Sequence, residues 1–335
     1  MRFKRMFSTI DTHTCGDPTR TVIGGLPYIP GKSMPEKMMY LKEKADWMRK
    51  ILMFEPRGNE VQSGAILTEP CTPGADIGVL YIEVGGYLTM CGHDTIGVGT
   101  ALIESGIIEP EEPYTTITLD TPAGLVRIKV KVENNVAQEV TFTNVPSYCL
   151  AQNVELDIPG IGVVLADVGY GGLFYCQVQA KDFNLKAEIS EYEQLKKFGC
   201  IIKDLINKKV KAYHPEHSFM NEITHVLFCG PADTPQGDMK NACIIPPGSV
   251  SRSPCGTGTS ARMATLFAKG IIKEDSIFNH ESAMTHTVFK GRIVGHTKVG
   301  EFDAIIPEIT GSAYVTGIHT FVIDPNDPLQ EGFRL

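Results

Sequence analysis

The order of apolar and polar positions along the chain predicts many short strands and few helices. Short apolar or alternating runs bounded by turn-forming residues are typical of strands. The runs of this kind are 19–23, 64–68, 77–84, 115–119, 125–133, 138–144, 161–168, 173–179, 223–229 and 241–245. A helix is expected from Ser33 to about Met53, because Ser33-Met34-Pro35-Glu36 has the capping-box spacing with Pro in the first turn. A second helix is expected over 189–208. The mixture predicts an α+β or α/β fold with mostly antiparallel strand pairing.

One stretch of the chain occurs twice. Segments 91–108 and 255–272 both begin with Cys-Gly, continue with small and apolar residues, and end with Gly-Ile-Ile. Each copy is typical of a loop, a helix that starts at the Cys-Gly pair, and a glycine stop. The repeat predicts two similar domains, each with a cysteine, Cys91 or Cys255, at the start of a helix.

A thiol in that position has a defined chemistry. The positive end of the helix and its free N–H groups stabilise a thiolate, and the same groups bind a carboxylate. Gly92 and Gly256 allow a ligand to approach the backbone closely. Two such units would hold one small carboxylate-bearing molecule between two cysteines. The expected reaction is proton exchange at the carbon next to the carboxylate: one thiolate removes the proton and the opposite thiol returns one to the other face.

Composition narrows the class of protein. The 335 residues suggest two domains, and 42% apolar residues suffice for a real core. The formal charge of −8 argues against nucleic acid and anionic membranes as partners. No apolar run approaches the length of a membrane span, and no apolar segment follows the basic first residues, so we do not expect a secretory signal. Nine cysteines, an odd number, favour a reduced, cytoplasmic protein.

Other functional motifs are not supported. The chain has no Cys-x-x-Cys pair for structural zinc, and no glycine fingerprint of a nicotinamide enzyme in the required context. The nucleophile motif Gly-x-Ser-x-Gly of many hydrolases is also missing. We therefore expect neither a metal nor a cofactor.

The sequence resembles the proline racemase family, which shares its architecture with diaminopimelate epimerase. Met90-Cys91-Gly92-His93 and 253–261, Ser-Pro-Cys-Gly-Thr-Gly-Thr-Ser-Ala, match the two family cysteine motifs. Further matches are 11–14, Gly16, 18–20, 55–58, 171–172 and 309–314, so that the similarity covers essentially the whole chain.

The resemblance implies a cytoplasmic, usually dimeric isomerase that needs no pyridoxal phosphate, and that racemises proline or epimerises hydroxyproline. It implies two pseudo-symmetric domains, each a mostly antiparallel sheet around a central helix, with the active site in the cleft between them. We expect residues 1–125 plus 300–335 in the first domain and 126–299 in the second. The resemblance places Gly92, His93, Gly256 and Thr257 at the substrate.

Two departures from the family pattern bear on the substrate ring. Proline-specific members tend to carry Phe at the positions of Ser63 and Ile245. A hydroxyl and a smaller apolar group in place of aromatic walls favour hydroxyproline, because Ser63 is able to bond a substrate hydroxyl. Ser63 facing a backbone group and only filling space is an equal alternative.

Two further departures concern the substrate nitrogen. The family commonly has Asp at the position of Ser251 and Gly at that of Asp94. One hypothesis is that Asp94 replaces the missing acid and pairs with the substrate ammonium, next to His93. The alternative is that Asp94 only favours its helix start. We include His225 as a candidate residue of the substrate pocket.

Three alternatives stay open at this point. Members of a dehydratase branch carry Thr at the second cysteine position, but Cys255 is present here, so trans-3-hydroxyproline dehydration is the weaker reading. If the changes at Ser251 and Asp94 reshape the pocket for the substrate nitrogen, an acyclic α-amino acid becomes an alternative substrate. A non-catalytic amino-acid-binding protein would have no need of both cysteines.

Overall fold

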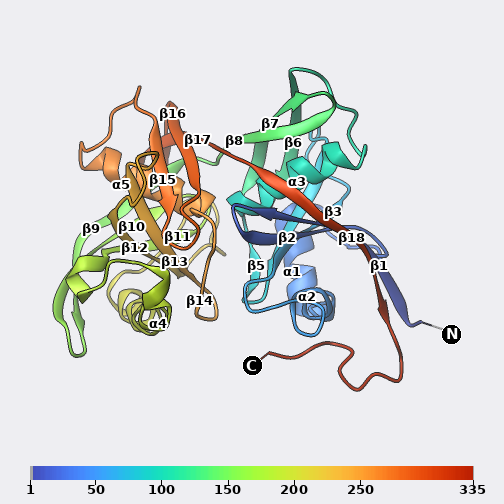
Figure 1. The fold of residues 1–335 in the computed structure, drawn as a ribbon, viewed down its shortest axis with the longest axis horizontal. Coiled ribbons are helices and arrows are strands. Elements are labelled where there is room, and N and C mark those ends of the chain that lie inside the picture. Colours follow the sequence, from blue (N-terminus) through green and yellow to red (C-terminus); the bar gives the residue numbers. More distant parts are fainter. Residues whose placement is uncertain (1–2, 335) are drawn as a thin grey trace. The chain divides into compact units, whose positions relative to one another are not determined.

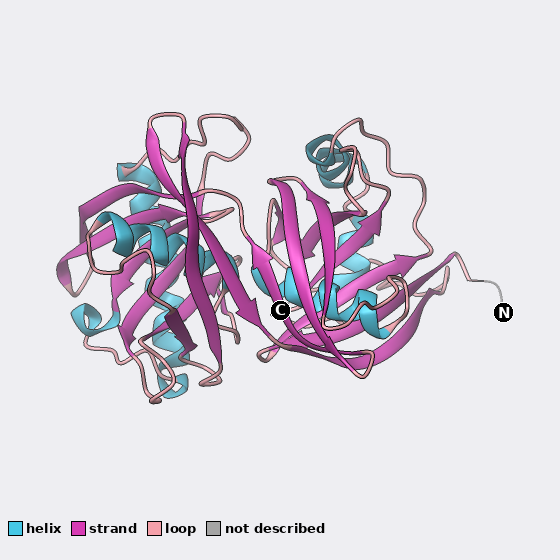
Figure 2. Cartoon of the chain, turned by 90° about the horizontal axis from the view of Figure 1, so that it is seen from above, coloured by secondary structure: helices cyan, strands magenta, loops and turns pink. Residues whose placement is uncertain are grey.

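A computed structural model describes residues 3–334. The chain divides into two compact units (Figure 1). Unit 1 contains the residues up to Phe142 together with those from Gly311 on, and unit 2 runs from Thr143 to Thr310. Both units are rich in strands, as the magenta arrows of Figure 2 show.

Unit 1 is built from nine strands and three helices within its described residues. Its strands are β1 (Arg5–Thr14), β2 (Asp17–Gly24), β3 (Ser63–Thr68), β4 (Ile77–Glu83), β5 (Gly86–Leu88), β6 (Tyr114–Thr121), β7 (Gly124–Glu133), β8 (Val136–Thr143) and β18 (Ala313–Ile323). Its helices are α1 (Met34–Lys44), α2 (Trp47–Met53) and α3 (Gly92–Glu104).

Unit 2 has a similar set of strands and helices. Its strands are β9 (Ser147–Ile158), β10 (Gly162–Tyr170), β11 (Phe174–Gln179), β12 (Ile223–Pro231), β13 (Met239–Ile245), β14 (Ser249–Val250), β15 (Phe278–Ser282), β16 (Val288–Val299) and β17 (Phe302–Gly311). Its helices are α4 (Tyr192–Lys209) and α5 (Gly256–Ala268), with short 3-10 turns η1 (Ala180–Phe183) and η2 (Ile189–Glu191).

The strands of the two units follow the same pairing scheme. In unit 1, β18, β1 and β2 pair antiparallel in that order, β2 runs parallel to β3, β3 antiparallel to β4, and β4 parallel to β6. In unit 2, β9, β10 and β11 pair antiparallel, β11 runs parallel to β12, β12 antiparallel to β13, and β13 parallel to β15. The order of parallel and antiparallel pairs is the same, so the repeat seen in the cysteine motifs extends to the strands around them.

Each unit places one buried helix and one outer helical layer against its sheet. Helices α3 and α5 are apolar or small along nearly their whole length and are buried, as a helix without a polar face must be. Helix α3 lies so close to strands β1 and β2 that Gly97 is required. A Cβ at this position would lie 2.7 Å from Thr12 Oγ1 and 2.9 Å from Thr19 Cβ. Helices α1 and α2 pack through Leu41 and Leu52 in another core, which includes Leu80 of β4.

The predicted elements can be compared with these bounds. Every predicted strand run overlaps an observed strand, and the mixed, mostly antiparallel fold class is confirmed. The Ser33 cap is confirmed, since its hydroxyl accepts the Glu36 N–H at 3.3 Å. The single helix expected up to Met53 is instead two helices, because Ala45 leaves helical geometry at φ −141° and the chain restarts at Trp47.

The unit boundaries differ from the expected ones at 125 and 300. Residues 126–142 stay with unit 1, because β7 pairs with β6 along its length. Residues 300–310 stay with unit 2, because β17 pairs with β16. The return of the chain end to the first unit therefore begins at Gly311.

Candidate active site

Cys91 stands at the start of α3 in unit 1. It is the N-cap residue, with φ −137° and ψ 117°, and is 4% exposed. Its carbonyl accepts the Thr95 N–H at 3.0 Å and the Thr95 hydroxyl at 2.7 Å, which fixes the first turn. Burial raises the pKa of this thiol, and the backbone N–H of Asp94, which bonds the sulfur, offsets only part of that rise. The expected thiol at a helix start is therefore present in the structure.

His93 and Asp94 lie against this thiol. His93 Nδ1 is 3.4 Å from Cys91 Sγ, and His93 Nε2 is 3.2 Å from Asp94 Oδ1. Asp94 has no exposed surface, and its oxygens accept bonds from Thr19 Oγ1 at 2.8 Å and Ser63 Oγ at 2.5 Å. Cys91, His93 and Asp94 thus form one bonded group, and strands β2 and β3 supply the hydroxyls that hold it.

The charges in this group depend on one another. Burial raises the pKa of Cys91 to about 12 and the Asp94 carboxylate adds to the rise, whereas His93 opposes it. Burial alone would lower the pKa of His93, but Cys91, Asp94 and Asp17 together raise it well above its usual range. Burial also disfavours the Asp94 carboxylate, yet His93 and Ser63 keep the pKa of Asp94 below its ordinary value. These directions favour an imidazolium–carboxylate pair at His93 and Asp94, and burial favours the protonated thiol at Cys91.

Cys255 stands at the start of α5 in unit 2. It is also the N-cap residue and is 7% exposed, but its φ of 64° lies in the left-handed region, unlike that of Cys91. Its carbonyl accepts the Thr259 N–H at 2.8 Å. At Gly258 a Cβ would lie 2.8 Å from the Cys255 sulfur, so glycine is needed there. The two repeat cysteines share their place on the helix and differ in local backbone.

A tyrosine that the sequence did not indicate lies beside Cys255. Tyr175 Oη is 3.4 Å from Cys255 Sγ and 2.6 Å from Thr257 Oγ1. Burial, with Cys255 and Cys243 adding to it, raises the pKa of Tyr175 well above its ordinary value. The phenol is therefore a neutral hydrogen-bonding group next to this thiol.

The remaining predicted residues fall into the same two places. Ser63 belongs to the Cys91 group. Ile245 packs against the buried cluster that contains Cys255 and Tyr175. His225 lies on β12 with its ring centroid 5.0 Å from that of Tyr175 and Nδ1 2.7 Å from Thr224 Oγ1. Ser251 is buried just after β14, where its N–H donates to the Cys243 carbonyl at 2.8 Å.

Two expected contacts take a different form in the structure. Ser63 neither faces a backbone group nor keeps its proton for a ligand, because it donates to Asp94. Asp94 is fully buried, with Thr19, Ser63 and His93 on its oxygens, so it has no free face toward a substrate ammonium. Ser63 and Asp94 are therefore hydrogen-bonded to each other.

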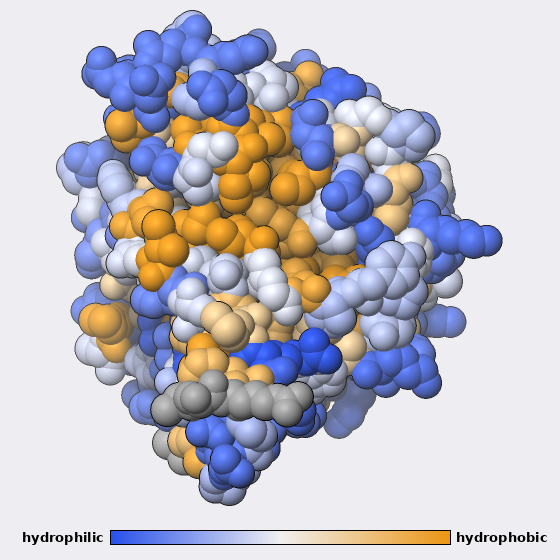
Figure 3. Space-filling model, turned by 90° about the vertical axis from the view of Figure 1, so that its right-hand side faces the viewer, coloured by the Kyte–Doolittle hydropathy of each residue, from blue (hydrophilic) through white to orange (hydrophobic). Residues whose placement is uncertain are grey.

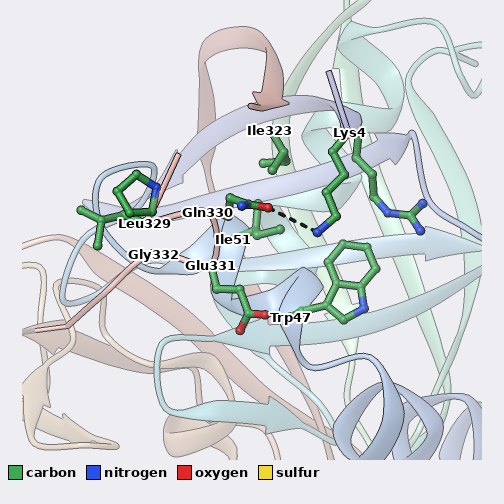
Figure 4. A pocket seen from close by; sticks show the side chains of 10 residues that line it. Lys4, Trp47, Ile51, Ile323, Leu329, Gln330, Glu331 and Gly332 are labelled. Atoms are coloured by element: carbon green, nitrogen blue, oxygen red, sulfur yellow. Dashed lines mark hydrogen bonds between the residues drawn. The ribbon is translucent and has the colours of Figure 1, made fainter. Parts of the chain in front are cut away.

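Other polar clusters and hollows lie apart from the thiols. Two sets of three side chains have ligand atoms within 4.8 Å of one another and satisfy the spacing of a metal site: His214, Glu216 and His217, and Asp233, Glu281 and His286. In the second set, Lys240 Nζ already lies 2.7 and 2.6 Å from the Asp233 oxygens. A hollow of about 670 Å³ in unit 1 is lined by Trp47, Lys4, Gln330 and neighbours (Figure 4), with no Cys or His among its ten residues. None of these places joins the repeated cysteine motifs.

Known proteins resemble this chain over its full length. The family described as proline racemase matches residues 9–334. Proline racemase of Acetoanaerobium sticklandii is 46% identical over 336 residues, covering 100% of both chains. The 4-hydroxyproline 2-epimerase of Streptosporangium roseum is also 46% identical, over 335 residues and 100% of both chains. The structure of a hydroxyproline epimerase from Agrobacterium vitis with bound trans-4-hydroxy-L-proline has a TM-score of 0.94 at 33% identity, covering 100% of this chain and 97% of that one.

Paired helix-start thiols in a repeated fold, together with these matches, define an isomerase of the racemase and epimerase class. The chain belongs to the proline racemase family. The resemblance drawn from the cysteine motifs is thereby confirmed. Within residues 3–334, no helix is both long and apolar enough to span a membrane.

Proposed function

We propose that this protein inverts the α-carbon of 4-hydroxyproline, with Cys91 and Cys255 as the two acid–base groups. One thiolate takes the α-proton, leaving the C–H electron pair on the carbon conjugated with the carboxylate. The other thiol gives its proton to the opposite face of that carbon. The two cysteines exchange roles for the reverse reaction, and no other reactant is consumed.

One observation carries the proposal. In both units a cysteine caps a buried helix that follows the same strand order. Free N–H groups at each helix start are suited to bind a carboxylate and to stabilise the charge that develops on it. Gly92, Gly256 and Thr257 lie in these first turns, so we assign them to substrate binding.

The choice of 4-hydroxyproline over proline rests on the side chains near each thiol. By the family resemblance, Ser63 and Ile245 stand where proline-specific members tend to carry Phe. Ser63 gives its proton to Asp94, but its oxygen keeps lone pairs that can accept from a ring hydroxyl. Relatives named for proline and for 4-hydroxyproline are equally similar, so these positions decide the proposal.

Proton NMR in D₂O tests it. The panel is trans-4-hydroxy-L-proline, L-proline, trans-3-hydroxy-L-proline and several acyclic amino acids. We expect loss of the α-proton signal of trans-4-hydroxy-L-proline and growth of its 2-epimer, both abolished in Cys91→Ala and Cys255→Ala. Faster turnover of proline or of an acyclic amino acid would overturn the substrate assignment. Water loss from the 3-hydroxy compound would favour the dehydratase alternative, and inversion that survives either substitution would overturn the two-thiol mechanism.

We also propose that the protein works as a cytoplasmic homodimer. Odd cysteine count supports a reducing compartment. Figure 3 shows apolar side chains gathered in a band on one face. Strand β18 leaves Tyr314 63% and Ile318 76% exposed, which favours burial against a second copy. Sedimentation of the native protein and of Ile318→Asp tests this, with a monomeric native protein contradicting it.

A further inference from the structure

We infer that Asp94 is a positioning residue, which Thr19 and Ser63 hold in place so that it fixes His93 against Cys91. The inference rests on the proposed role of Cys91 as one of the two bases. It assigns to Asp94 a task that acts through His93 and not on the substrate nitrogen.

Two of the four departures from the family pattern support each other physically. By the family resemblance, proline-specific members tend to carry Phe at the position of Ser63, and the family commonly has Gly at that of Asp94. In the structure the Ser63 hydroxyl donates to Asp94 Oδ2 at 2.5 Å. A Phe at 63 offers no such donor, and a buried carboxylate without donors is strongly destabilising. We therefore expect Ser63 and Asp94 to act as a pair.

The carboxylate has no surface left for a ligand. Thr19 Oγ1 lies 2.8 Å from Oδ1, and His93 Nε2 lies 3.2 Å from the same oxygen. Ser63 lies on Oδ2, and the Cys91 side chain also bonds the carboxylate, so four partners surround a side chain that is 0% exposed. A substrate ammonium would have to displace one of them.

His93 carries the effect to the thiol. A histidine nitrogen that donates to a carboxylate has its ring orientation fixed, and the other nitrogen is then presented to the next group. Here that nitrogen, Nδ1, lies 3.4 Å from Cys91 Sγ. The charged and titratable groups facing the ring are Asp94 and Cys91 from the start of α3, and Asp17 of β2, with Oδ2 3.9 Å from Nδ1. Asp94 is the one bonded to Nε2, so it fixes the angle of the ring and, after Cys91, adds to the charge that favours the imidazolium.

Cys255 has no counterpart of this arrangement. Gly258 stands at the repeat position of Asp94, and Thr257 at that of His93. On the strands, the parallel pair Thr19–Ser63 of unit 1 corresponds to the parallel pair Tyr175–His225 of unit 2. Cys91 is thus adjacent to a charged donor and Cys255 to a neutral one. The two thiols are consequently unequal, although the repeat alone predicts near-equivalence.

The test compares Asp94→Asn with a matched control. Asp120→Asn also removes a buried acidic side chain in unit 1, but Asp120 accepts from Cys71, Thr72 and no ring. The first readout is the titration of the His93 ring by NMR, with the signal identified through His93→Gln. We expect its pKa to fall by about one unit or more in Asp94→Asn. Asp120→Asn leaves it unchanged, and Ser63→Ala gives a smaller fall.

The second readout is the steady-state kinetics of inversion. We expect Asp94→Asn to lower kcat by about ten- to a hundredfold while KM changes less than about twofold, because the substrate contact is untouched. A rise in KM at constant kcat would instead place Asp94 on the substrate and overturn the inference. An unchanged His93 titration in a folded Asp94→Asn protein would overturn it as well.

The two readouts separate this inference from the proposed function. The His93 titration is measured without substrate, so it remains decisive if 4-hydroxyproline is not turned over. Conversely, normal inversion with an unperturbed His93 contradicts only the role of Asp94.

Discussion

The hydroxyl of Tyr175 lies 3.4 Å from the sulfur of Cys255, on a strand 80 residues away in the chain, and bonds Thr257 at 2.6 Å. This neutral donor is the nearest polar side-chain contact described for that thiol. Cys91 has the charged His93–Asp94 pair beside it, whereas Cys255 has a phenol.

Replacing this phenol provides the first prediction. Tyr175→Phe leaves Thr257 without its partner and should lower the free energy of unfolding by about 1–2 kcal/mol. Loss of the bond to the sulfur should lower kcat for inversion about tenfold. Tyr170→Phe is the matched control, because Tyr170 is another buried tyrosine of unit 2 whose hydroxyl contacts Met220 instead. Equal activity losses in both variants would show that Tyr175 acts only in packing.

Alkylation of Cys91 tests its protonation in the absence of substrate. Burial raises the pKa of Cys91 to about 12, so the reactive thiolate forms only as the pH approaches that value. The rate of iodoacetamide labelling, followed by mass spectrometry of the peptide containing Cys91, should still be rising at about pH 10. A plateau below about pH 8 would mean that the imidazolium of His93 outweighs burial.

Stability in mild acid should depend on a buried histidine of unit 2. Burial lowers the pKa of His280 to about 3, while the ring bonds Thr259 Oγ1 at 2.8 Å. In the unfolded chain the same ring titrates near its ordinary value of 6.5. Below that pH the unfolded state binds the proton and the folded state does not. The free energy of unfolding should therefore fall by up to about 1.4 kcal/mol per pH unit between about pH 6.5 and 3.

Urea unfolding at several pH values measures this slope. His280→Gln should flatten it, since the variant has no proton to take up. The half-exposed His296, which contacts Glu274, provides the control His296→Gln. An equal slope in native protein and His280→Gln would assign the acid sensitivity to other groups.

Two glycines of α3 should respond differently to an added methyl group. In Gly97→Ala the Cβ meets Thr12 Oγ1 at 2.7 Å and Thr19 Cβ at 2.9 Å, both close to the strand backbone. In Gly99→Ala its nearest neighbour is Ile128 Cδ1, the flexible end of a side chain, at 2.9 Å. We expect a stability loss of about 1–3 kcal/mol for Gly97→Ala and a smaller one for Gly99→Ala.

Activity adds a second measurement for the same pair. Displacement of Thr19 withdraws a donor from Asp94, so Gly97→Ala should also lower activity, while Gly99→Ala should not. Larger losses of stability and activity in Gly99→Ala than in Gly97→Ala would contradict the idea that Gly97 allows α3 to lie close to the strands.

The parts of the fold predicted from sequence are those with a local signal. The short buried strands have compact apolar runs, and the cysteine motifs occur twice, so both were predictable. Strand β18 was not, because nine of its eleven positions are partly or fully exposed and its apolar residues do not alternate with polar ones. The break between α1 and α2 was missed because the capping signal fixes a start and carries no information about Ala45.

The side chains around the thiols were likewise predicted only where a local sequence signal exists. His93 and Asp94 are next to Cys91 in sequence and were candidates from the outset. Thr19 reaches Asp94, and Tyr175 reaches Cys255, only through the sheet, across 75 and 80 residues. The match at 18–20 includes Thr19 but does not indicate this contact, and no local pattern marks Tyr175. The expected contact of Asp94 with the substrate nitrogen did not anticipate its burial, which depends on hydroxyls from two other strands.

The parallel strand pair beneath each helix start has an evolutionary consequence. Thr19 with Ser63, and Tyr175 with His225, hold the same register in their units. If the halves arose by duplication of an ancestral gene, these two positions allowed each copy to diverge without altering its cysteine or its helix. Mutations confined to a strand can then retune one acid–base group while the other stays as inherited, which gives such an enzyme a short route to new substrates.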